Sequence, residues 1–211
     1  MKNPSRLCLL VVAATALAAS AASAQSISNG SYENGSIPSG DYCYISAPGC
    51  TISDWSGSAA SVLATSFAWG TPAGHGNSAL IDGTKVIGLQ MNRFIEQEIP
   101  LPAGTYTISW VDAARAGYDS QTYNVSLGAQ TSTSFFTTGE QAWAPRSATF
   151  SLSSSSPVIL KFTGIGNQYD GTAFIDNVTI AAVPEPGALA MMAAGLTGIG
   201  LMRRRAATKK V

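Results

Sequence analysis

Histidine is nearly absent from this 211-residue chain, in which His75 is the only one. A Ser-His-Asp triad would have to use His75, yet glycines surround it and no Gly-x-Ser-x-Gly elbow accompanies it, so we interpret it as a loop residue. The chain also lacks a His-Glu-x-x-His zinc motif and a phosphate-binding Gly-x-x-x-x-Gly-Lys loop. The sequence therefore predicts a protein without catalytic residues, which is not an enzyme.

Carboxylate pairs leave one catalytic option open, because two carboxylates at a fixed separation hydrolyse glycosidic bonds. Glu96, Glu98 and Asp112 are available for such a pair. Glu96 and Glu98 are two residues apart, so on a strand they share one face, which the alternating pattern turns partly toward solvent. A solvated sheet face explains them better, and an exported glycan hydrolase has the least support of the functions considered.

Basic residues are scarce between Gln25 and Ala182, where five lysines and arginines accompany eleven aspartates and glutamates, a net charge of −6. The other basic residues crowd the two ends of the chain, so the formal net charge of zero conceals an acidic middle. Such a domain repels phosphate backbones, which excludes nucleic acid as a partner.

The amino end has the three parts of a secretory signal: basic Lys2 and Arg6, an apolar run from Leu7 to Ala19, and small residues ending in Ala22-Ser23-Ala24. The apolar run is short for a permanent membrane span. We expect residues 1–24 to form a signal peptide that is cleaved after Ala24.

Cysteine is rare, and Cys8 would leave with the signal peptide. Cys43 and Cys50 remain, in an oxidising compartment where disulfides persist. The Pro48-Gly49 turn between them can bring the two thiols together, and a zinc site would lack two further ligands. We predict a Cys43–Cys50 disulfide.

The carboxyl end carries Pro184-Glu185-Pro186, then an apolar stretch from Ala188 to Met202, then Arg203 to Arg205. The apolar stretch is marginal for a bilayer, which suits a short and temporary transmembrane helix. The arginines would stay cytoplasmic under the positive-inside bias and leave the preceding domain outside the inner membrane.

This order of Pro-Glu-Pro, apolar helix and basic terminus resembles the PEP-CTERM sorting signal of Gram-negative bacteria, over residues 183–211. In that family an exosortase recognises the signal and removes the tail, and the proteins are associated with exopolysaccharide. The resemblance implies that Pro184, Glu185 and Pro186 are the sorting motif. It also implies a transient inner-membrane anchor, followed by a cell-surface or extracellular location.

Residues 25–182 show no sustained helical period and alternate instead, which predicts an all-β fold. The alternation predicts two strands, at Phe94–Ile99 and Thr105–Val111, joined at Pro102-Ala103-Gly104. Further strands are expected at residues 60–67, 123–127, 147–152, 158–163 and 173–180. Their spacing predicts a single antiparallel β-sandwich or jelly roll, with helices only in the two terminal segments.

Four segments in order resemble the galactose-binding-like jelly rolls of bacterial carbohydrate-binding modules. They are residues 29–33 as the opening strand, 54–55 as the next element, 97–109 as a central hairpin and 174–178 as the closing strand. Relatives in that family often hold a structural calcium between the opening and closing strands. The resemblance implies Glu33 and Asp176 as calcium ligands with Asn29 assisting, and the alternative is that the carboxylates only bond loop backbone.

Aromatic residues are the other binding candidates, because sugar C–H faces stack on flat rings. Trp69, Tyr118, Tyr123 and Trp143 lie in or beside loop-like segments, and Arg115, Asp119 and Gln121 are polar partners near Tyr118. Packing in the core is the alternative for all four rings, and it is the expectation for Trp55 and Trp110.

The sequence thus predicts an exported, exosortase-sorted protein whose sandwich binds polysaccharide or packs into an extracellular matrix. The alternative is a structural surface protein with no specific ligand. Calcium is the one cofactor considered, and exosortase, exopolysaccharide and transiently the inner membrane are the expected partners.

Overall fold

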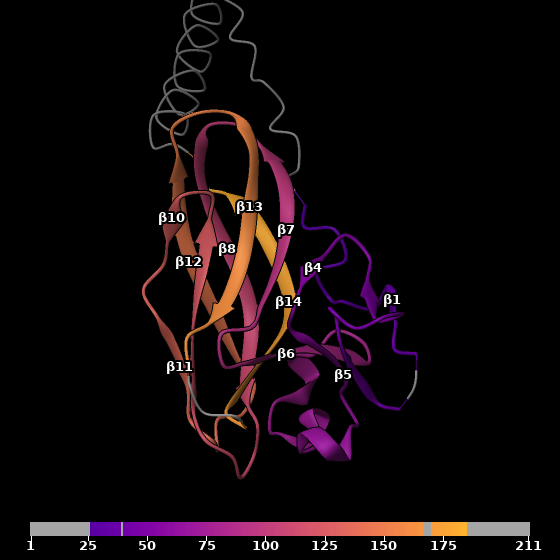
Figure 1. Cartoon of the computed structure of the whole chain (residues 1–211). Helices are drawn as coiled ribbons and strands as arrows, with labels where there is room; N and C mark the ends of the chain where they lie inside the picture. The colour runs from indigo at the N-terminus through magenta and orange to yellow at the C-terminus, as the bar shows by residue number, and fades with distance from the viewer. Residues whose placement is uncertain (1–25, 39, 167–169, 185–211) are drawn as a thin grey trace, which may run out of the picture.

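Two antiparallel sheets make up the fold in the computed structural model, which describes residues 26–38, 40–166 and 170–184 (Figure 1). The predicted signal peptide, Glu185, Pro186 and the apolar stretch after them lie outside the described residues. Within the described ranges, no helix has the length and apolarity needed to cross a membrane. The predicted all-β sandwich is confirmed.

The first sheet contains six strands in the order β12-β8-β14-β6-β5-β2. Their bounds are β2 Tyr42–Tyr44, β5 Ala60–Leu63, β6 Lys85–Gln90, β8 Gly104–Ala114, β12 Ala144–Leu152 and β14 Thr172–Ala182. The second sheet follows the order β10-β9-β13-β7-β4, with β11 also pairing with β9. These strands are β4 Ser56–Gly57, β7 Phe94–Leu101, β9 Gln121–Leu127, β10 Gln130–Thr131, β11 Phe135–Thr137 and β13 Ser156–Gly164.

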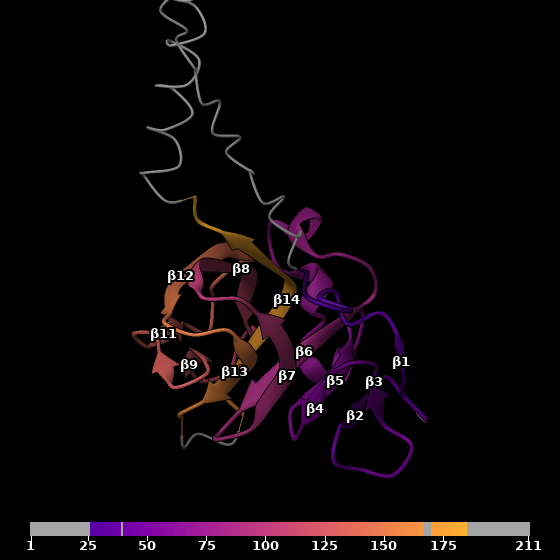
Figure 2. The same cartoon turned by 90° about the horizontal axis from the view of Figure 1, so that it is seen from above.

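Short elements fill the amino-terminal part, which lies beside the long strands in both views (Figures 1 and 2). Strands β1 Gly35–Ser36 and β3 Thr51–Ile52 form a separate pair. Three 3₁₀ turns follow β5, namely η1 Phe67–Trp69, η2 Pro72–Gly74 and η3 Ser78–Leu80. The strand expected at residues 60–67 therefore ends at Leu63, and Phe67 belongs to a turn.

The turn at Pro102-Ala103-Gly104 does join two strands, but they do not form the central hairpin that the resemblance implied. Strand β7 pairs with β13 and β4, whereas β8 pairs with β12 and β14. Both strands carry an apolar row, with Ile95 and Ile99 on β7 and Ile108 and Trp110 on β8, all at most 2% exposed. Because the chain passes from the second sheet to the first at this turn, the apolar rows of β7 and β8 face each other in the same core. In a flat hairpin the two strands would lie side by side in one sheet.

Around β6 the first sheet is buried on both faces. Toward the second sheet it contributes Ile87, Ile108 and Trp110 to the main core. On the other face, Val86, Val111 and Phe174 form a second core with Trp69 from turn η1 and Trp143 from the segment before β12. The candidate site lies at the edge of this second core.

The predicted disulfide is confirmed, with the Cys43 and Cys50 sulfurs bonded and their Cα atoms 5.9 Å apart. The intervening loop turns through two backbone hydrogen bonds, from Ala47 N to Tyr44 O (2.8 Å) and from Cys50 N to Ala47 O (3.2 Å). Because Cys43 is the central residue of β2, the bridge ties this three-residue edge strand to the loop that follows it.

Candidate ligand-binding site

A cavity of about 470 Å³ opens between β2, η1, the end of β6 and the loop after β8. Three aromatic residues line it: Tyr42, Tyr44 and Trp69. Its polar lining consists of Gln90, Arg93, Arg115 and Asp170. The cavity therefore combines flat rings with convergent polar groups, which is the composition typical of a small-molecule or sugar site.

Trp69 forms the floor of this cavity. Turn η1 ends at Gly70, whose φ of 75° is left-handed and whose N–H donates to Phe67 O at 3.0 Å. The indole lies against Phe174, with ring centroids 6.3 Å apart, and crosses the backbone of Gly88. A Cβ at position 88 would lie 2.7 Å from Trp69 Cζ3. The glycine in β6 therefore allows the indole ring to pack directly against the sheet.

Tyr42 and Tyr44 form one wall, because residues two apart on a strand share a face. Their ring centroids lie 5.5 and 6.3 Å from that of Trp69. Tyr44 Oη donates to Gln90 Oε1 at 3.1 Å, and Gln90 Nε2 donates to Thr172 Oγ1 at 3.1 Å. These bonds fix the side chain of Gln90 at the cavity.

Two arginines complete the wall. The Arg93 guanidinium lies 4.0 Å from the centroid of Tyr44 and donates from Nη1 to Ser58 O at 2.8 Å. Arg115 stacks on Tyr118 at 3.6 Å and lies 5.4 Å from Trp69, and its Nη2 donates to Ala68 O at 2.7 Å. Cation–π contacts of this kind hold a guanidinium plane in a fixed orientation.

Two exposed aromatic rings lie at the cavity. Tyr42 is 38% exposed and lines it, and Tyr118 is 42% exposed and stacks on the lining residue Arg115. Phe67 is 90% exposed and precedes the lining residue Ala68 in η1. Exposed aromatic rings are the side chains on which the C–H faces of sugars stack.

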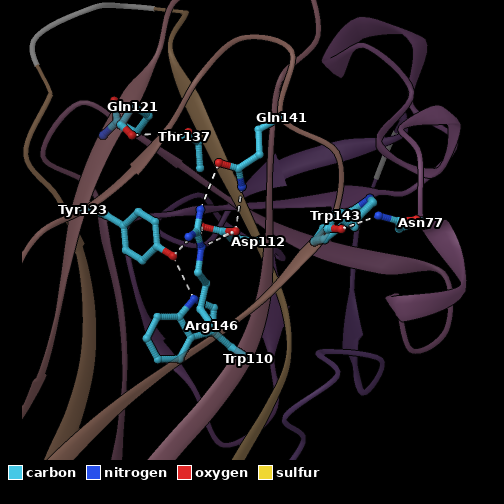
Figure 3. Close-up of polar contacts among 9 residues, drawn as sticks. All are labelled: Asn77, Trp110, Asp112, Gln121, Tyr123, Thr137, Gln141, Trp143 and Arg146. Atoms are coloured by element: carbon cyan, nitrogen blue, oxygen red, sulfur yellow. Dashed lines mark hydrogen bonds and ion pairs between the residues drawn. The ribbon is translucent and has the colours of Figure 1, made fainter.

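The structure brings together three of the five residues predicted to bind a ligand, since Trp69, Tyr118 and Arg115 meet at this cavity. For Tyr123 and Trp143 the prediction is wrong, because both rings are wholly buried and fill the two cores. Trp143 Nε1 donates to Pro72 O at 2.9 Å, while Asn77 Nδ2 donates to Trp143 O at 3.1 Å (Figure 3). Of the polar partners, Gln121 is also buried and bonds Met91 O.

Tyr123 belongs to a buried polar network that links the two sheets (Figure 3). Its hydroxyl accepts from Trp110 Nε1 and donates to Asp112 Oδ2, both at 2.8 Å. Arg146 Nε reaches Asp112 Oδ1 at 2.9 Å, and Gln141 Nε2 donates to the same oxygen at 2.7 Å. Burial raises the pKa of Asp112, and the hydrogen bonds and the arginine oppose that rise.

The carboxylates considered for glycoside hydrolysis lie apart from the cavity. Asp112 is wholly buried and ion-paired, as described above. Glu96 pairs with Lys161 on the adjacent strand at 3.0 Å, and Glu98 is exposed on the same face of β7. His75 lies in a loop, where its Nε2 accepts from Ala116 N at 3.2 Å.

Asp176 is the most perturbed acid near the predicted calcium site. It is wholly buried, its Oδ2 accepts from Asp82 N at 2.8 Å, and its Oδ1 has no hydrogen-bond partner. Burial, followed by repulsion from Asp82 and Glu33, raises the pKa of Asp176 to about 8 against the pull of two backbone N–H groups. The Tyr32 hydroxyl, also buried and unpartnered, is electrostatically coupled to it.

A cation beside Asp176 Oδ1 would neutralise the buried carboxylate, but the side chains of the other two candidate ligands are already hydrogen-bonded. Glu33 accepts from Thr84 N (2.8 Å) and Lys85 N (2.6 Å), which is the loop-bonding alternative. The Asn29 side chain closes its own turn through Asn34 and Ser53, which corrects its expected role as a ligand. In the described part of the chain, no three His, Cys, Asp or Glu side chains are placed to hold a metal.

Comparison with known proteins identifies the carboxyl end. Residues 182–205 match the PEP-CTERM protein-sorting motif, which confirms that resemblance, whereas no curated protein matches the chain. The chain is an antiparallel β-sandwich that carries a PEP-CTERM sorting motif. The motif marks it as a protein sorted for export.

Several carbohydrate-binding modules of solved structure are similar to this chain. The CBM22-1 xylan-binding domain of Paenibacillus barcinonensis Xyn10C is 10% identical, with a TM-score of 0.46 over 72% of this chain and 97% of that one. TmCBM61 in complex with β-1,4-galactotriose is 19% identical, with a TM-score of 0.44 over 62% and 90%. The CBM36-1 domain of a xylanase from the hindgut metagenome of Trinervitermes trinervoides is 13% identical, with a TM-score of 0.41 over 53% and 86%.

The sequence predicted only Trp69 and Arg115 among the residues that line the cavity. Tyr42 and Tyr44 flank Cys43, and their alternation predicts a shared strand face that could have been noticed. Arg93 is one of only five cations in the sandwich, yet its place beside Tyr44 depends on the pairing of β2, β5 and β6. That pairing joins segments about 50 residues apart, which no local pattern reveals.

Proposed function

We propose that this chain is an exported protein whose jelly-roll domain binds polysaccharide in the cavity between β2, η1 and the loop after β8. The observation that carries the proposal is the convergence of exposed rings and fixed polar groups at one opening. Tyr42 and Tyr118 offer flat faces for sugar C–H groups. Gln90 and the two arginines offer donors for hydroxyl groups.

The route to the outside follows from the sorting motif. Residues 1–24 direct export and are removed, and residues 183–211 hold the chain briefly in the inner membrane. An exosortase recognises Pro184, Glu185 and Pro186 and releases the domain to the cell surface or the extracellular matrix. At the cell surface or in the matrix, the domain would meet exopolysaccharide, which is the ligand we propose.

The experiment that tests binding is affinity electrophoresis of the full chain in mild detergent, through gels that contain one soluble polysaccharide each. Retardation is expected in at least one gel, and Tyr42→Ala with Tyr118→Ala should abolish it. Phe136→Ala is the matched control, because Phe136 is 53% exposed on β11 in the other sheet. No retardation in any gel would contradict the proposal and favour the structural surface protein without a ligand.

We also propose a structural calcium ion at Asp176. The buried and unpartnered Oδ1 is the observation in its favour, since an unpaired carboxylate is costly in a protein interior. Asp176 would supply one oxygen, and backbone carbonyls and water would complete the six to eight that calcium takes. The ion would join the closing strand β14 to the loop around Asp82.

A further inference from the structure

The cations of the sandwich are unevenly placed. Of five, three are occupied away from the cavity: Lys161 pairs with Glu96, Arg146 pairs with Asp112, and Lys85 Nζ donates to Glu33 O. The other two, Arg93 and Arg115, both line the cavity. A domain with a net charge of −6 thus places both of its remaining cations at one opening.

Most N–H donors of the Arg93 side chain have no partner among the described residues. Among the described residues no carboxylate lies within ion-pair distance of it, and its one hydrogen bond runs from Nη1 to Ser58 O. A guanidinium carries five N–H groups, so most of them remain for a ligand. The Tyr44 ring at 4.0 Å holds the guanidinium plane, and Arg93 is only partly buried, which keeps its donors within reach.

Arg115 is 7% exposed, and its Nε has no hydrogen-bond partner in the described part of the chain. Its Nη1 contacts Asp170 Oδ1 at 3.2 Å, but the Asp170 side chain is 64% exposed. An ion pair to so exposed a carboxylate is weak, so a ligand carboxylate can replace it. The three charged residues of the cavity leave a net charge of +1 there.

Unpaired arginines discriminate between ligands. A planar guanidinium pairs with a planar carboxylate through two parallel N–H···O bonds. A neutral sugar that covers Arg93 removes water from the cation without supplying an anion, which weakens its binding. The net charge of −6 over residues 25–182 repels polyanions that do not reach these two arginines.

From this placement we infer that the cavity selects carboxylate-bearing polysaccharide, a chain that contains uronic acids, over neutral polysaccharide. This inference rests on the proposed function, because it names the ligand class of the same cavity. Arg93 supplies the unpaired cation that a uronate carboxylate meets, and Tyr42 supports the ring of the same or the next sugar.

The test is affinity electrophoresis of the full chain in mild detergent with three acidic probes: polygalacturonate, alginate and a glucuronan. Each is run beside its own carboxyl-reduced, neutral form, and dextran sulfate reports the effect of charge alone. At least one acidic probe should bind about tenfold or more tightly than its neutral form, since each charge-assisted pair strengthens binding by at least that much. Rising salt should weaken this binding.

Variants separate selectivity from folding. Arg93→Gln should reduce the preference for the acidic probe to less than about twofold, whereas Lys161→Gln, which removes a cation on β13, should leave it unchanged. Thermal melting of both variants checks that they fold. Arg93→Lys, which keeps the charge without the planar donor pair, should give an intermediate preference.

Each outcome decides a different claim. Equal binding of acidic and neutral forms, or binding of neutral forms only, overturns the selectivity and leaves the proposed function standing. Equally tight binding of dextran sulfate also overturns it, because charge without a planar carboxylate would then suffice. No binding of any probe, together with no retardation in the wider set of gels, overturns the proposed function itself.

Discussion

Asp112 shows how one buried charge organises its surroundings. It lies between the sheets, and its two oxygens accept from Tyr123, Gln141 and Arg146. A buried carboxylate is tolerated only when its hydrogen bonds are complete, so this network constrains the positions of β8, β9 and β12. The same arrangement explains why Tyr123, an aromatic residue with a polar end, is found in the core and not in a ligand site.

Arg146→Ala should therefore destabilise the domain by about 3–5 kcal/mol, because it leaves the Asp112 charge buried without its cation. Chemical denaturation measures the free energy of unfolding. Lys161→Ala is the control. Arg146 and Lys161 are similarly exposed, at 30% and 33%, but Glu96 is 26% exposed whereas Asp112 is wholly buried, so loss of the Lys161 pair should cost about 1 kcal/mol or less. Equal losses for the two variants would show that the network adds nothing to stability.

Among the candidate ligand-binding residues, aromatic types were recognisable from the sequence and their positions were not. Of Trp69, Tyr118, Tyr123 and Trp143, three are buried in the two cores, and of these three only Trp69 also lines the cavity. The difference arises from what covers the outer face of the first sheet, where Trp143 packs at 6.3 Å from Phe174. That covering depends on long-range packing, which a window of neighbouring residues does not contain.

At the scale of elements, β2 connects the disulfide to the cavity. This edge strand is only three residues long, and Tyr42 and Tyr44 stand on either side of Cys43. It pairs with β5 alone, so little besides the disulfide and that pairing holds it in place.

Replacing both cysteines, Cys43→Ser with Cys50→Ser, should lower stability by about 2–3 kcal/mol, the loop-closure entropy of a bridge this short. It should also weaken polysaccharide binding, because Tyr42 and Tyr44 lose a fixed backbone. Melting with and without reductant, followed by affinity electrophoresis at a temperature where both forms are folded, measures the two effects. Unchanged binding in the folded variant would show that the bridge is not needed to position the cavity.

Most long strands were predictable because they alternate, whereas β6 was not. Its segment Val86-Ile87-Gly88-Leu89 is an uninterrupted apolar run that is buried on both faces, so it has no period of two. The turn at Pro102-Ala103-Gly104 was correctly placed but its pairing was not. Alternation in the sequence shows which side chains of a strand lie on the same face. It does not show which strand pairs with it, because that choice depends on how distant segments pack into the core.

In the whole molecule, the folded domain and the sorting motif occupy consecutive parts of the chain. The PEP-CTERM motif begins at residue 182, where the last strand β14 ends at Ala182. The sorting segment therefore starts as the sheet ends, so the proposed removal of the tail would leave the cavity on the domain. We predict that the released form and the membrane-held form bind the same polysaccharide equally well.

Calcium would act on the stability of the whole domain, because Asp176 lies on the central strand β14 of the first sheet. Calcium at 100 times its Kd should raise the stability by about 2.7 kcal/mol, and a chelator should reverse the change. Asp176→Asn should abolish the response while the metal-free variant remains at least as stable, since it removes a buried unpaired acid. Glu98→Gln, an exposed carboxylate on β7, is the control.

No shift in melting temperature with calcium or chelator, for the chain with Asp176 intact, would contradict the metal proposal. The binding cavity would be unaffected by that result, because neither Asp176 nor Asp82 is among its lining residues.

The central claim is that polysaccharide binds in the cavity floored by Trp69. The most direct test is nuclear magnetic resonance of the full chain in detergent with ¹⁵N-labelled tryptophan, titrated with the polysaccharide that binds best. The indole N–H groups of Trp55, Trp110 and Trp143 donate to Ser28, Tyr123 and Pro72 inside the fold. If polysaccharide binds in this cavity, the Trp69 indole signal should shift and the other three signals should stay in place. Binding that leaves the Trp69 signal unshifted would contradict the proposed location of the site.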